Sequence, residues 1–394
     1  MPVTTACKRE IARQLRKPGG QAMPQFNSPS PGTTRAIFVR HGRSTDNDAQ
    51  RFQGRSDRSV LTERGWAAAR QTGRALRGIG FDAIYTSPLQ RAIQTTCALV
   101  KQLNTHDLPR SAPVKCPALM EVDLPHWAGR TYASVREELP ADYQCWQDSP
   151  DAFSLTTPRA RGSQVTFPVL DLYAQIRTFW EMLLNEHRGQ TVLAIAHGGS
   201  VRAAISTAIG LPAKHYHQLQ QSNCGISVVE FSEAPDFPPM SLQALNLTGH
   251  LHETLPKLKA GKQGARVILL PAESDRLHQP WLRALAPDQC WIDRSDAARS
   301  LASQIVGTEP LALFPCAAEW GQTAQALAQS TDAITVLAIA STAFLYDLLS
   351  TWLRFSTTAA SKCAIVPNSA TVIHFPSPTR SPVLQALNFT PPEI

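Results

Sequence analysis

Two histidines in the sequence are each followed directly by glycine, in the segments Arg40-His41-Gly42-Arg43-Ser44 and His197-Gly198-Gly199. Each segment follows a short apolar run that is typical of a buried parallel strand. A histidine in this place stands where open α/β sheets bind their ligands, at the carboxyl end of a strand. A lone histidine is more often structural, but two such histidines in one domain, with arginines nearby, favour a binding or catalytic site.

Groups that attract anions surround both histidines. Arg40 supplies a cation directly before His41, and Gly42 lets the backbone approach a bound group closely. Gly198 opens an expected helix, whose N-terminal N–H groups and dipole favour an anion. Asn47 could donate a hydrogen bond to a phosphate oxygen. Arg91, in the first turn of another expected helix, either points back toward the strand ends or is a solvated surface arginine.

The elements expected around these residues alternate between strand and helix. We expect strands at residues 35–39, 81–86, 114–119, 191–196 and 226–231, and helices at residues 61–76, 88–103, 132–139, 143–147, 170–187 and 198–209. This alternation predicts an α/β fold, with a mostly parallel sheet and helices on both faces.

Two short strings recur later in the chain, in the same order and with similar spacing. Residues 191–196 (TVLAIA) reappear as 335–340, and residues 242–246 (LQALN) reappear as 384–388. The repetition predicts a duplication, in which the second copy is truncated and degenerate. Aligned on the apolar runs, His41 becomes Pro271, Arg40 becomes Leu270 and His197 becomes Ser341. The alternative is an unrelated α/β module in the last third of the chain.

These patterns divide the chain into four parts. Residues 1–33 are basic and then rich in Ser, Pro and Gly, and we expect a disordered tail there. A targeting presequence and a translation start at Met23 are the alternatives. Residues 34–254 form the expected catalytic domain, residues 255–264 a basic linker, and residues 265–394 a degenerate domain predicted to be inactive.

Bulk composition excludes several classes of protein. The 394 residues suit two domains, and no apolar run is long enough for a membrane span. The net charge is +7, but the sequence has no dense Lys/Arg stripe with interleaved aromatics. We therefore expect the partner to be an anionic small molecule and not a nucleic acid. Eight scattered cysteines without a CxxC pair favour a reducing, cytoplasmic compartment over disulfides, and no residue cluster has metal-ligand spacing.

Taken together, five motifs resemble those of the histidine phosphatase (phosphoglycerate mutase-like) superfamily. They are RHGRSTDN at residues 40–47, RFQG at 51–54, LTERG at 61–65, TSPLQRA at 86–92 and AHGG at 196–199. The resemblance implies His41 as the nucleophile, with Arg40, Arg91 and His197 forming the phosphate pocket. It implies a phosphate contact at Asn47, a substrate contact at Gln53-Gly54, and Glu121 as the acid. Because Asp123 lies close by, a surface role for Glu121 is the alternative.

Physical chemistry agrees with these implied roles and requires no metal or other cofactor. Catalysis of phosphoryl transfer consists mostly of positioning and electrostatic stabilisation, which two arginines and a second histidine supply. Their charges should also lower the pKa of His41, which favours the neutral imidazole that must attack phosphorus.

The resemblance also bears on the fate of the phosphoryl group. Cofactor-dependent phosphoglycerate mutases of the family carry a tyrosine three residues after the acid, where this chain has Leu124. Gln53 also replaces a small hydroxyl residue that is typical of mutases. Both departures favour a phosphatase, and the mutase is the alternative.

The tandem arrangement and the segment QQSNCG at 220–225 resemble two-domain proteins related to 2-carboxy-D-arabinitol-1-phosphate phosphatase. This resemblance implies a sugar or sugar-acid phosphate as substrate. Arg159 and Arg161 replace part of a common family motif, and either meet a second anionic group or belong to a solvated loop. Homo-oligomerisation is left open, as is a regulatory or binding role for the second domain.

Overall fold

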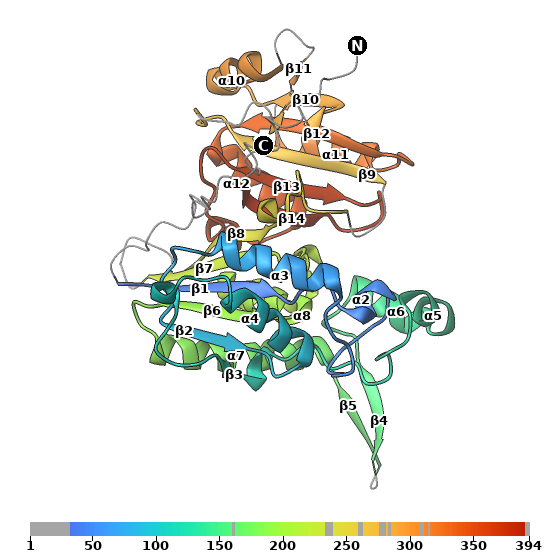
Figure 1. Cartoon of the computed structure of the whole chain (residues 1–394). Helices are drawn as coiled ribbons and strands as arrows, with labels where there is room; N and C mark the ends of the chain where they lie inside the picture. Colours follow the sequence, from blue (N-terminus) through green and yellow to red (C-terminus); the bar gives the residue numbers. More distant parts are fainter. Residues whose placement is uncertain are drawn as a thin grey trace, which may run out of the picture.

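The computed structural model describes residues 32–159, 162–232, 239–258, 263–275, 281–282, 285–306, 311–313 and 316–390. Within them, one sheet of twelve strands passes through both halves of the chain (Figure 1). In spatial order its strands are β11 (Leu311–Leu313), β10 (Gln289–Ile292), β12 (Ala333–Ala340), β9 (Gly264–Pro271), β13 (Ala370–Phe375), β14 (Val383–Phe389), β8 (Met240–Leu247), β7 (Ile226–Ser232), β1 (Thr33–Arg40), β6 (Thr191–Ala196), β2 (Ala83–Thr86) and β3 (Val114–Lys115).

Helices accompany the sheet in both halves. The first half contains α2 (Thr45–Asp48), α3 (Glu63–Ala75), α4 (Gln90–Val100), α5 (Tyr132–Glu138), α6 (Pro140–Asp148), α7 (Pro168–Glu186) and α8 (Gly198–Ile209), with short 3-10 turns that include η3 (Pro117–Leu119) and η4 (Ala213–Gln218). The second half contains α10 (Asp296–Val306), α11 (Ala317–Leu327), α12 (Thr342–Leu353) and α13 (Thr357–Ser361).

The predicted α/β class is confirmed. Strands β1, β6, β2 and β3 run parallel, as do β9, β12, β10 and β11, while the strands between these two sets are antiparallel. The expected strand at residues 114–119 is shorter, because a proline-led turn (η3) replaces its second half. A hairpin of β4 (Leu155–Arg159) and β5 (Gly162–Thr166) was not predicted, and it projects from the body (Figure 1).

Alternating residues of the central strands pack into two separate apolar layers. Ala36 and Phe38 of β1 contact the layer that contains α7 and α8, whereas Ile37 and Val39 contact the layer that contains residues of α4. Strands covered on both faces are apolar along their whole length, which explains the unbroken apolar runs in the sequence. Both layers continue into the second half, through β9 and β12.

The strand order on the two sides of the β8–β14 contact is mirrored. Outward from β8 lie β7, β1, β6, β2 and β3; outward from β14 lie β13, β9, β12, β10 and β11. The identical TVLAIA strings fall in β6 and β12, and the identical LQALN strings fall in β8 and β14. The second half therefore repeats the fold of the first half in shortened form. Among the described residues it has no counterpart of α5, α6 or the β4–β5 hairpin.

Strand pairing corrects the alignment of the two copies by one residue. The backbone N–H of His41 donates to Ala196 O at 2.9 Å, and the N–H of Ala272 donates to the equivalent Ala340 O at 2.8 Å. Ala272, not Pro271, therefore occupies the place of His41, and Pro271 occupies the place of Arg40. The sequence alignment was wrong by one residue because it was based on an apolar run, and β9 extends one residue beyond that run.

The hairpin between β13 and β14 (residues 376–382) lies at the edge of the sheet where β1 ends. This follows from the strand directions, because β13 runs in the same direction as β1 and β14 runs back from that edge. No helix in the described part of the chain is long and apolar enough to cross a bilayer. The expected tail (residues 1–33) lies outside the described residues except for its last two positions. Residues 259–262 of the expected linker also lie outside the described residues.

Candidate active site

His41 follows the last residue of β1 and is 2% exposed. Its Nδ1 lies 2.7 Å from the carbonyl oxygen of Gly42. Since a carbonyl only accepts, Nδ1 carries the proton in this contact, and the lone pair of the neutral ring is on Nε2. The backbone of His41 is fixed on both sides, because its N–H donates to Ala196 O and Asn223 Nδ2 donates to its carbonyl at 3.0 Å.

His197 follows β6, caps the N-terminus of α8 and stands beside His41, with the two ring centroids 5.1 Å apart. Arg91 Nε donates to His197 Nδ1 at 3.2 Å, so Nδ1 is an acceptor. The proton on Nε2 then donates to Ser87 Oγ at 2.7 Å. The ring of His197 is therefore held in one tautomer and one orientation.

Two arginines lie next to the histidines. Arg91 is fully buried in the first turn of α4, and its Nη1 and Nη2 donate to Ser56 O and Gly54 O, both at 2.8 Å. It is therefore not the solvated surface arginine of the alternative hypothesis. Arg40 donates from Nη1 to Gln221 O at 2.8 Å, but its buried Nε has no hydrogen-bond partner within the described residues. A buried, unpaired N–H of a guanidinium is costly, and a bound anion would satisfy it.

Glu121 follows η3 and reaches the N-terminus of α8. Its Oε2 accepts from the backbone N–H of Gly199 at 3.1 Å, and its Oε1 accepts from the N–H of Val122 at 2.9 Å. A Cβ at Gly199 would lie 2.1 Å from Glu121 Oε1, so glycine is required for this approach. Asp123 is exposed and lies 3.8 Å from Arg55, away from the histidines. Of the two carboxylates, Glu121 is thus the one at the site.

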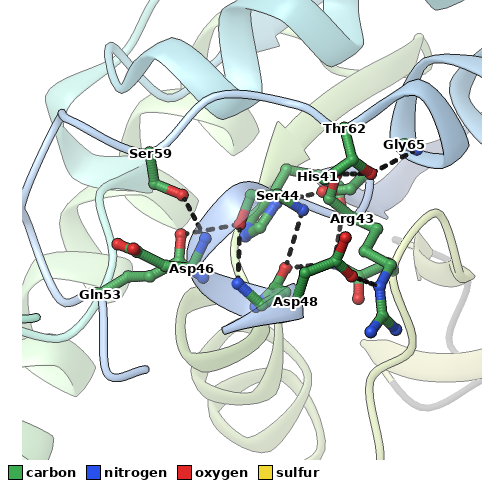
Figure 2. A network of polar contacts seen from close by, with 12 residues as sticks. His41, Arg43, Ser44, Asp46, Asp48, Gln53, Ser59, Thr62 and Gly65 are labelled. Atoms are coloured by element: carbon green, nitrogen blue, oxygen red, sulfur yellow. Dashed lines mark hydrogen bonds and ion pairs between the residues drawn. The ribbon is translucent and has the colours of Figure 1, made fainter. Parts of the chain in front are cut away.

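A network of hydrogen bonds holds the segment after β1, as Figure 2 shows. Ser44 Oγ donates to Gln53 Oε1 at 3.1 Å, and the N–H of Asp46 donates to Ser59 Oγ at 3.1 Å. Thr62 caps α3 by accepting from the N–H of Gly65 at 3.1 Å, and it donates to Arg43 O. These contacts fix the loop on which His41 is placed.

Asn47 lies in the short helix α2, and Gly54 lies in the loop that follows it. Asn47 Oδ1 accepts from the N–H of Ser44 at 3.3 Å and from Asn223 Nδ2 at 3.0 Å, which leaves its own Nδ2 as a donor for a ligand. Gly54 has φ +49°, a left-handed conformation that favours glycine, and its carbonyl accepts from Arg91.

Burial and positive charge act together on the two histidines. Burial is the main cause that lowers the pKa of His41 well below its usual 6.5, and the charges of Arg91 and Arg40 lower it further. The pKa of His197 is lowered for the same reasons, with burial first. The expected neutral His41 is thus obtained, although desolvation contributes more than the arginines. Burial likewise lowers the pKa of Arg91 to about 10, so this side chain remains a cation near neutral pH.

These side chains share one cavity of about 580 Å³. It brings together most of the site residues expected from the sequence, namely Arg40, His41, Asn47, Gln53, Gly54, Arg91, Glu121 and Gly198, while His197 lies directly behind His41. No group of three or more His, Cys, Asp or Glu side chains able to hold a metal ion occurs among the described residues.

The geometry agrees with the comparison against known families. Residues 36–236 match the model of the histidine phosphatase superfamily (branch 1). The chain belongs to this superfamily. That match ends before β8 and includes every candidate residue named above.

Relatives in this superfamily include both phosphatases and mutases. A 2-carboxy-D-arabinitol-1-phosphatase of Triticum aestivum is 33% identical over 60% of this chain, which corresponds to 45% of the wheat protein. A phosphoserine phosphatase 1 of Hydrogenobacter thermophilus is 27% identical over 55% of this chain and 94% of its own length. A 2,3-bisphosphoglycerate-dependent phosphoglycerate mutase of Bartonella quintana is 32% identical over 49% of this chain and 89% of its own length. The chain thus aligns with less than half of its wheat relative.

Several residues that line the cavity or hold its lining were not expected from the sequence. Asn223 holds both His41 and Asn47, although its segment QQSNCG was singled out only for its resemblance to relatives. Tyr132, Arg202 and Tyr216 come from helical segments whose spacing gave no functional signal. Arg159 pairs with Gly162 at the tip of the β4–β5 hairpin, and Arg161 lies outside the described residues.

The equivalent positions of the second half carry different chemistry. Ala272 and Ser341 occupy the places of His41 and His197. Asp293 occupies the place of Ser87, since its N–H donates to Ile339 O as that of Ser87 donates to Ile195 O. Asp293 accepts from the N–H of Ser341 at 2.8 Å. A carboxylate therefore stands where the first half collects cations.

Proposed function

We propose that the chain is a phosphatase that hydrolyses small phosphate monoesters through a phosphohistidine on His41, without a metal ion. The observation that carries the proposal is the orientation of His41. Its Nδ1–H is bound to Gly42 O, so that its Nε2 lone pair is available beside buried Arg91 and half-buried Arg40. A neutral imidazole nucleophile next to fixed cations is the arrangement that in-line attack on a phosphate monoester requires.

In the first step, His41 Nε2 attacks phosphorus, the new N–P bond forms, and the bond from phosphorus to the ester oxygen breaks. The unpaired Nε–H of Arg40 and the Nδ2 amide of Asn47 would donate to the equatorial oxygens, and the charge of Arg91 stabilises them. Glu121, in its protonated form, would transfer its proton to the departing oxygen. The hydrogen bond that it accepts from the N–H of Gly199, at the start of α8, supports this role.

In the second step, water attacks the phosphohistidine. Glu121, left as a carboxylate by the first step, takes a proton from the attacking water, and the N–P bond breaks to release inorganic phosphate. The proton on Nδ1 stays on the imidazole throughout, because Gly42 O holds it. His41 therefore returns to the same neutral tautomer after each turnover.

The test is hydrolysis of p-nitrophenyl phosphate in the presence of EDTA. We expect turnover by the full chain and an acid-labile phosphohistidine after rapid quenching. We expect His41→Ala to lose about a thousandfold or more in kcat. His106→Ala is the matched control, because the side chain of His106 is 77% exposed and does not line the cavity. Full activity of His41→Ala would overturn the proposal.

For the substrate we propose sugar phosphates or sugar-acid phosphates. The wheat relative is named for a sugar-acid phosphate, and the cavity of about 580 Å³ has room for a chain of several carbons. The ranking of kcat/KM across a panel of three- to six-carbon phosphates tests this class. Equal rates for all of them would contradict it.

A phosphoglycerate mutase is the second candidate, favoured by the similarity to the Bartonella quintana protein. A mutase would rephosphorylate the bound product, so 2,3-bisphosphoglycerate should stimulate isomerisation of 3-phosphoglycerate while hydrolysis is negligible. Leu124 and Gln53, which line the cavity, are the two departures from mutases that led us to prefer hydrolysis.

We propose that the second half is catalytically inactive, because Ala272, Ser341 and Asp293 replace the nucleophile and its partners. The division into a catalytic domain (34–254), a linker (255–264) and a degenerate domain (265–394) is part of this proposal. We also propose a reducing, cytoplasmic location, which the free cysteines of the described part support. Peptide mapping of alkylated protein from cells would test that location.

A further inference from the structure

The second half of the chain forms part of the cavity that contains His41. Six residues of the β13–β14 region line it, namely His374, Pro376, Thr379, Arg380, Ser381 and Val383. The direction of the strands explains this, because the hairpin between β13 and β14 lies at the edge where β1 ends. A half of the protein without catalytic residues is therefore in a position to contact the substrate.

Hydrogen bonds to the first half fix the start of β14 beside the cavity. The N–H of Gln220 donates to Leu384 O at 2.9 Å, and Gln218 Nε2 donates to Pro382 O at 3.3 Å. Buried Gln385 donates to Gln220 Oε1 at 3.0 Å. The hairpin is thus anchored to the last residue of η4 and to the segment that follows it, both of which belong to the first half of the chain.

Arg380 is the charged residue of this hairpin that lines the cavity. It is exposed at the rim, where its Nη2 lies 3.2 Å from Gln147 Oε1, at the end of α6. This weak contact leaves most of the five guanidinium N–H groups of Arg380 for another acceptor. Gln147 also lines the cavity, so the contact joins the two halves across its rim.

The cavity carries more cations than the phosphate site requires. Its ionised side chains are Arg40, Arg51, Arg91, Arg202, Lys214 and Arg380 against Glu121 and Asp148. Arg40 and Arg91 serve the phosphoryl group in the proposed mechanism. The other cations have one carboxylate, Asp148, to offset them, and Asp148 already accepts from Gln144. The lining of the cavity therefore carries positive charge in excess of the two arginines assigned to the phosphoryl group.

The charge of Arg202 acts both on the phosphate site and on His217, which also feels the charge of Arg380. Its charge lowers the pKa of Arg40 at the phosphate site, where burial is the main cause. Burial, followed by the charges of Arg202 and then Arg380, lowers the pKa of His217 to about 3 despite its contact with Trp146 O. His217 is neutral at any ordinary pH and adds no charge of its own. Arg202 lines the same cavity as Arg40 and Arg380, where its Nε donates to Leu219 O at 2.8 Å and its guanidinium lies 5.4 Å from the centroid of the Tyr216 ring.

We propose that Arg380, contributed by the inactive half, binds a second anionic group of the substrate, such as a carboxylate, at the end of the substrate remote from the phosphate. This inference rests on the proposed function, because it assumes that the phosphate occupies the site beside His41. Arg202 and Lys214 complete the subsite from the first half. Arg380 makes the enzyme selective for phosphate esters that carry an additional negative charge.

A pair of ligands that differ in one group provides the test. 6-Phosphogluconate carries a terminal carboxylate where glucitol 6-phosphate carries a hydroxymethyl group. Binding of both is measured by calorimetry at fixed ionic strength, on the full chain with His41→Ala, which cannot turn them over. We expect this protein to bind 6-phosphogluconate about tenfold more tightly. We expect the added substitution Arg380→Gln to remove most of that preference while affinity for glucitol 6-phosphate changes less than about twofold.

Arg299→Gln, at an exposed position of α10 in the same half, is the matched control and should change neither affinity. The inference is overturned if the His41→Ala protein shows no preference for 6-phosphogluconate. It is also overturned if that preference survives the added substitution Arg380→Gln. An equal loss of affinity for both ligands, which indicates a merely structural role, overturns it as well. Turnover of both esters by the chain with His41 intact is measured in parallel. A carboxylate preference in binding without any hydrolysis would refute the proposed function and leave the subsite standing.

Discussion

Asn246 and Asn388 make equivalent hydrogen bonds across the boundary between the two halves. Asn246 Nδ2 donates to Gln385 O and Asn388 Nδ2 donates to Gln243 O, both at 2.7 Å. Both residues end the repeated LQALN string, and both have a left-handed φ, of +52° and +55°. Two copies of one strand are thus joined by two copies of one contact, as in an interface with twofold symmetry.

Asn388→Ala should destabilise the whole chain. Asn388 is 3% exposed, and its removal leaves the carbonyls of Gln243 and Ala364 and the N–H of Val366 without their partner. Alanine also tolerates the left-handed φ poorly. Together these effects should lower the free energy of unfolding by about 2–4 kcal/mol. Urea unfolding followed by circular dichroism measures the change.

Gln243→Ala, on β8 and half-exposed, is the control for that experiment and should cost less than about 1 kcal/mol, because the substitution leaves the backbone carbonyl that accepts from Asn388 in place. Because the contacts are equivalent, Asn246→Ala should cost nearly as much as Asn388→Ala. A loss confined to one of the two asparagines would contradict the symmetric role assigned to them.

The duplication could be found from the sequence because its best-preserved parts are the most constrained ones. In each half TVLAIA lies in a strand that is covered on both faces of the sheet. LQALN packs in its own half and also makes hydrogen bonds to the other copy. The joining of the halves into one sheet could not be foreseen. Strand pairing between distant segments depends on backbone groups that every residue carries, so composition does not encode it.

Protonation of His41 should not slow hydrolysis when the pH falls slightly below neutral. Its pKa lies well below 6.5, mainly because it is buried, so lowering the pH from about 8 to about 6 leaves the nucleophile neutral. The acid limb of kcat/KM that belongs to His41 should therefore have its midpoint below 6.5. A pH–rate profile with p-nitrophenyl phosphate measures it. Arg91→Gln removes the larger charge contribution, and the limb should move to higher pH even though the rate falls.

Gly199→Ala should reduce catalysis through Glu121. The added Cβ would lie 2.1 Å from Glu121 Oε1 and 2.3 Å from the hydroxyl of Tyr216, so the carboxylate must move. In the proposed mechanism Glu121 protonates the departing oxygen, so the loss should be larger for an alkyl phosphate than for p-nitrophenyl phosphate, whose leaving group needs no proton. We expect about a hundredfold loss in kcat for the alkyl ester. Gly80→Ala is the control, because a Cβ there meets nothing within 4 Å.

The residues of the site were predictable to different degrees for physical reasons. His41, Arg91 and His197 stand at strand ends or helix starts, positions that local sequence patterns mark. Glu121 follows a short turn with no periodicity, so only the resemblance to relatives pointed to it. Arg380 had no local signal at all. Its place in the cavity depends on how β14 pairs with β8, which lies 140 residues away in the sequence.

Buried histidines should make the fold sensitive to mild acid. Burial lowers the pKa of His250 to about 4 and that of His217 to about 3, against about 6.5 when unfolded. Below pH 6.5 the unfolded chain therefore binds protons that the folded chain does not. Stability is complete above that pH, and each such histidine costs up to about 1.4 kcal/mol per pH unit as the pH falls toward its folded pKa. Urea unfolding at about pH 7, 6 and 5 measures this slope. His250→Gln should reduce the slope and His106→Gln, at an exposed position, should not; equal slopes in all three proteins would mean that His250 does not contribute.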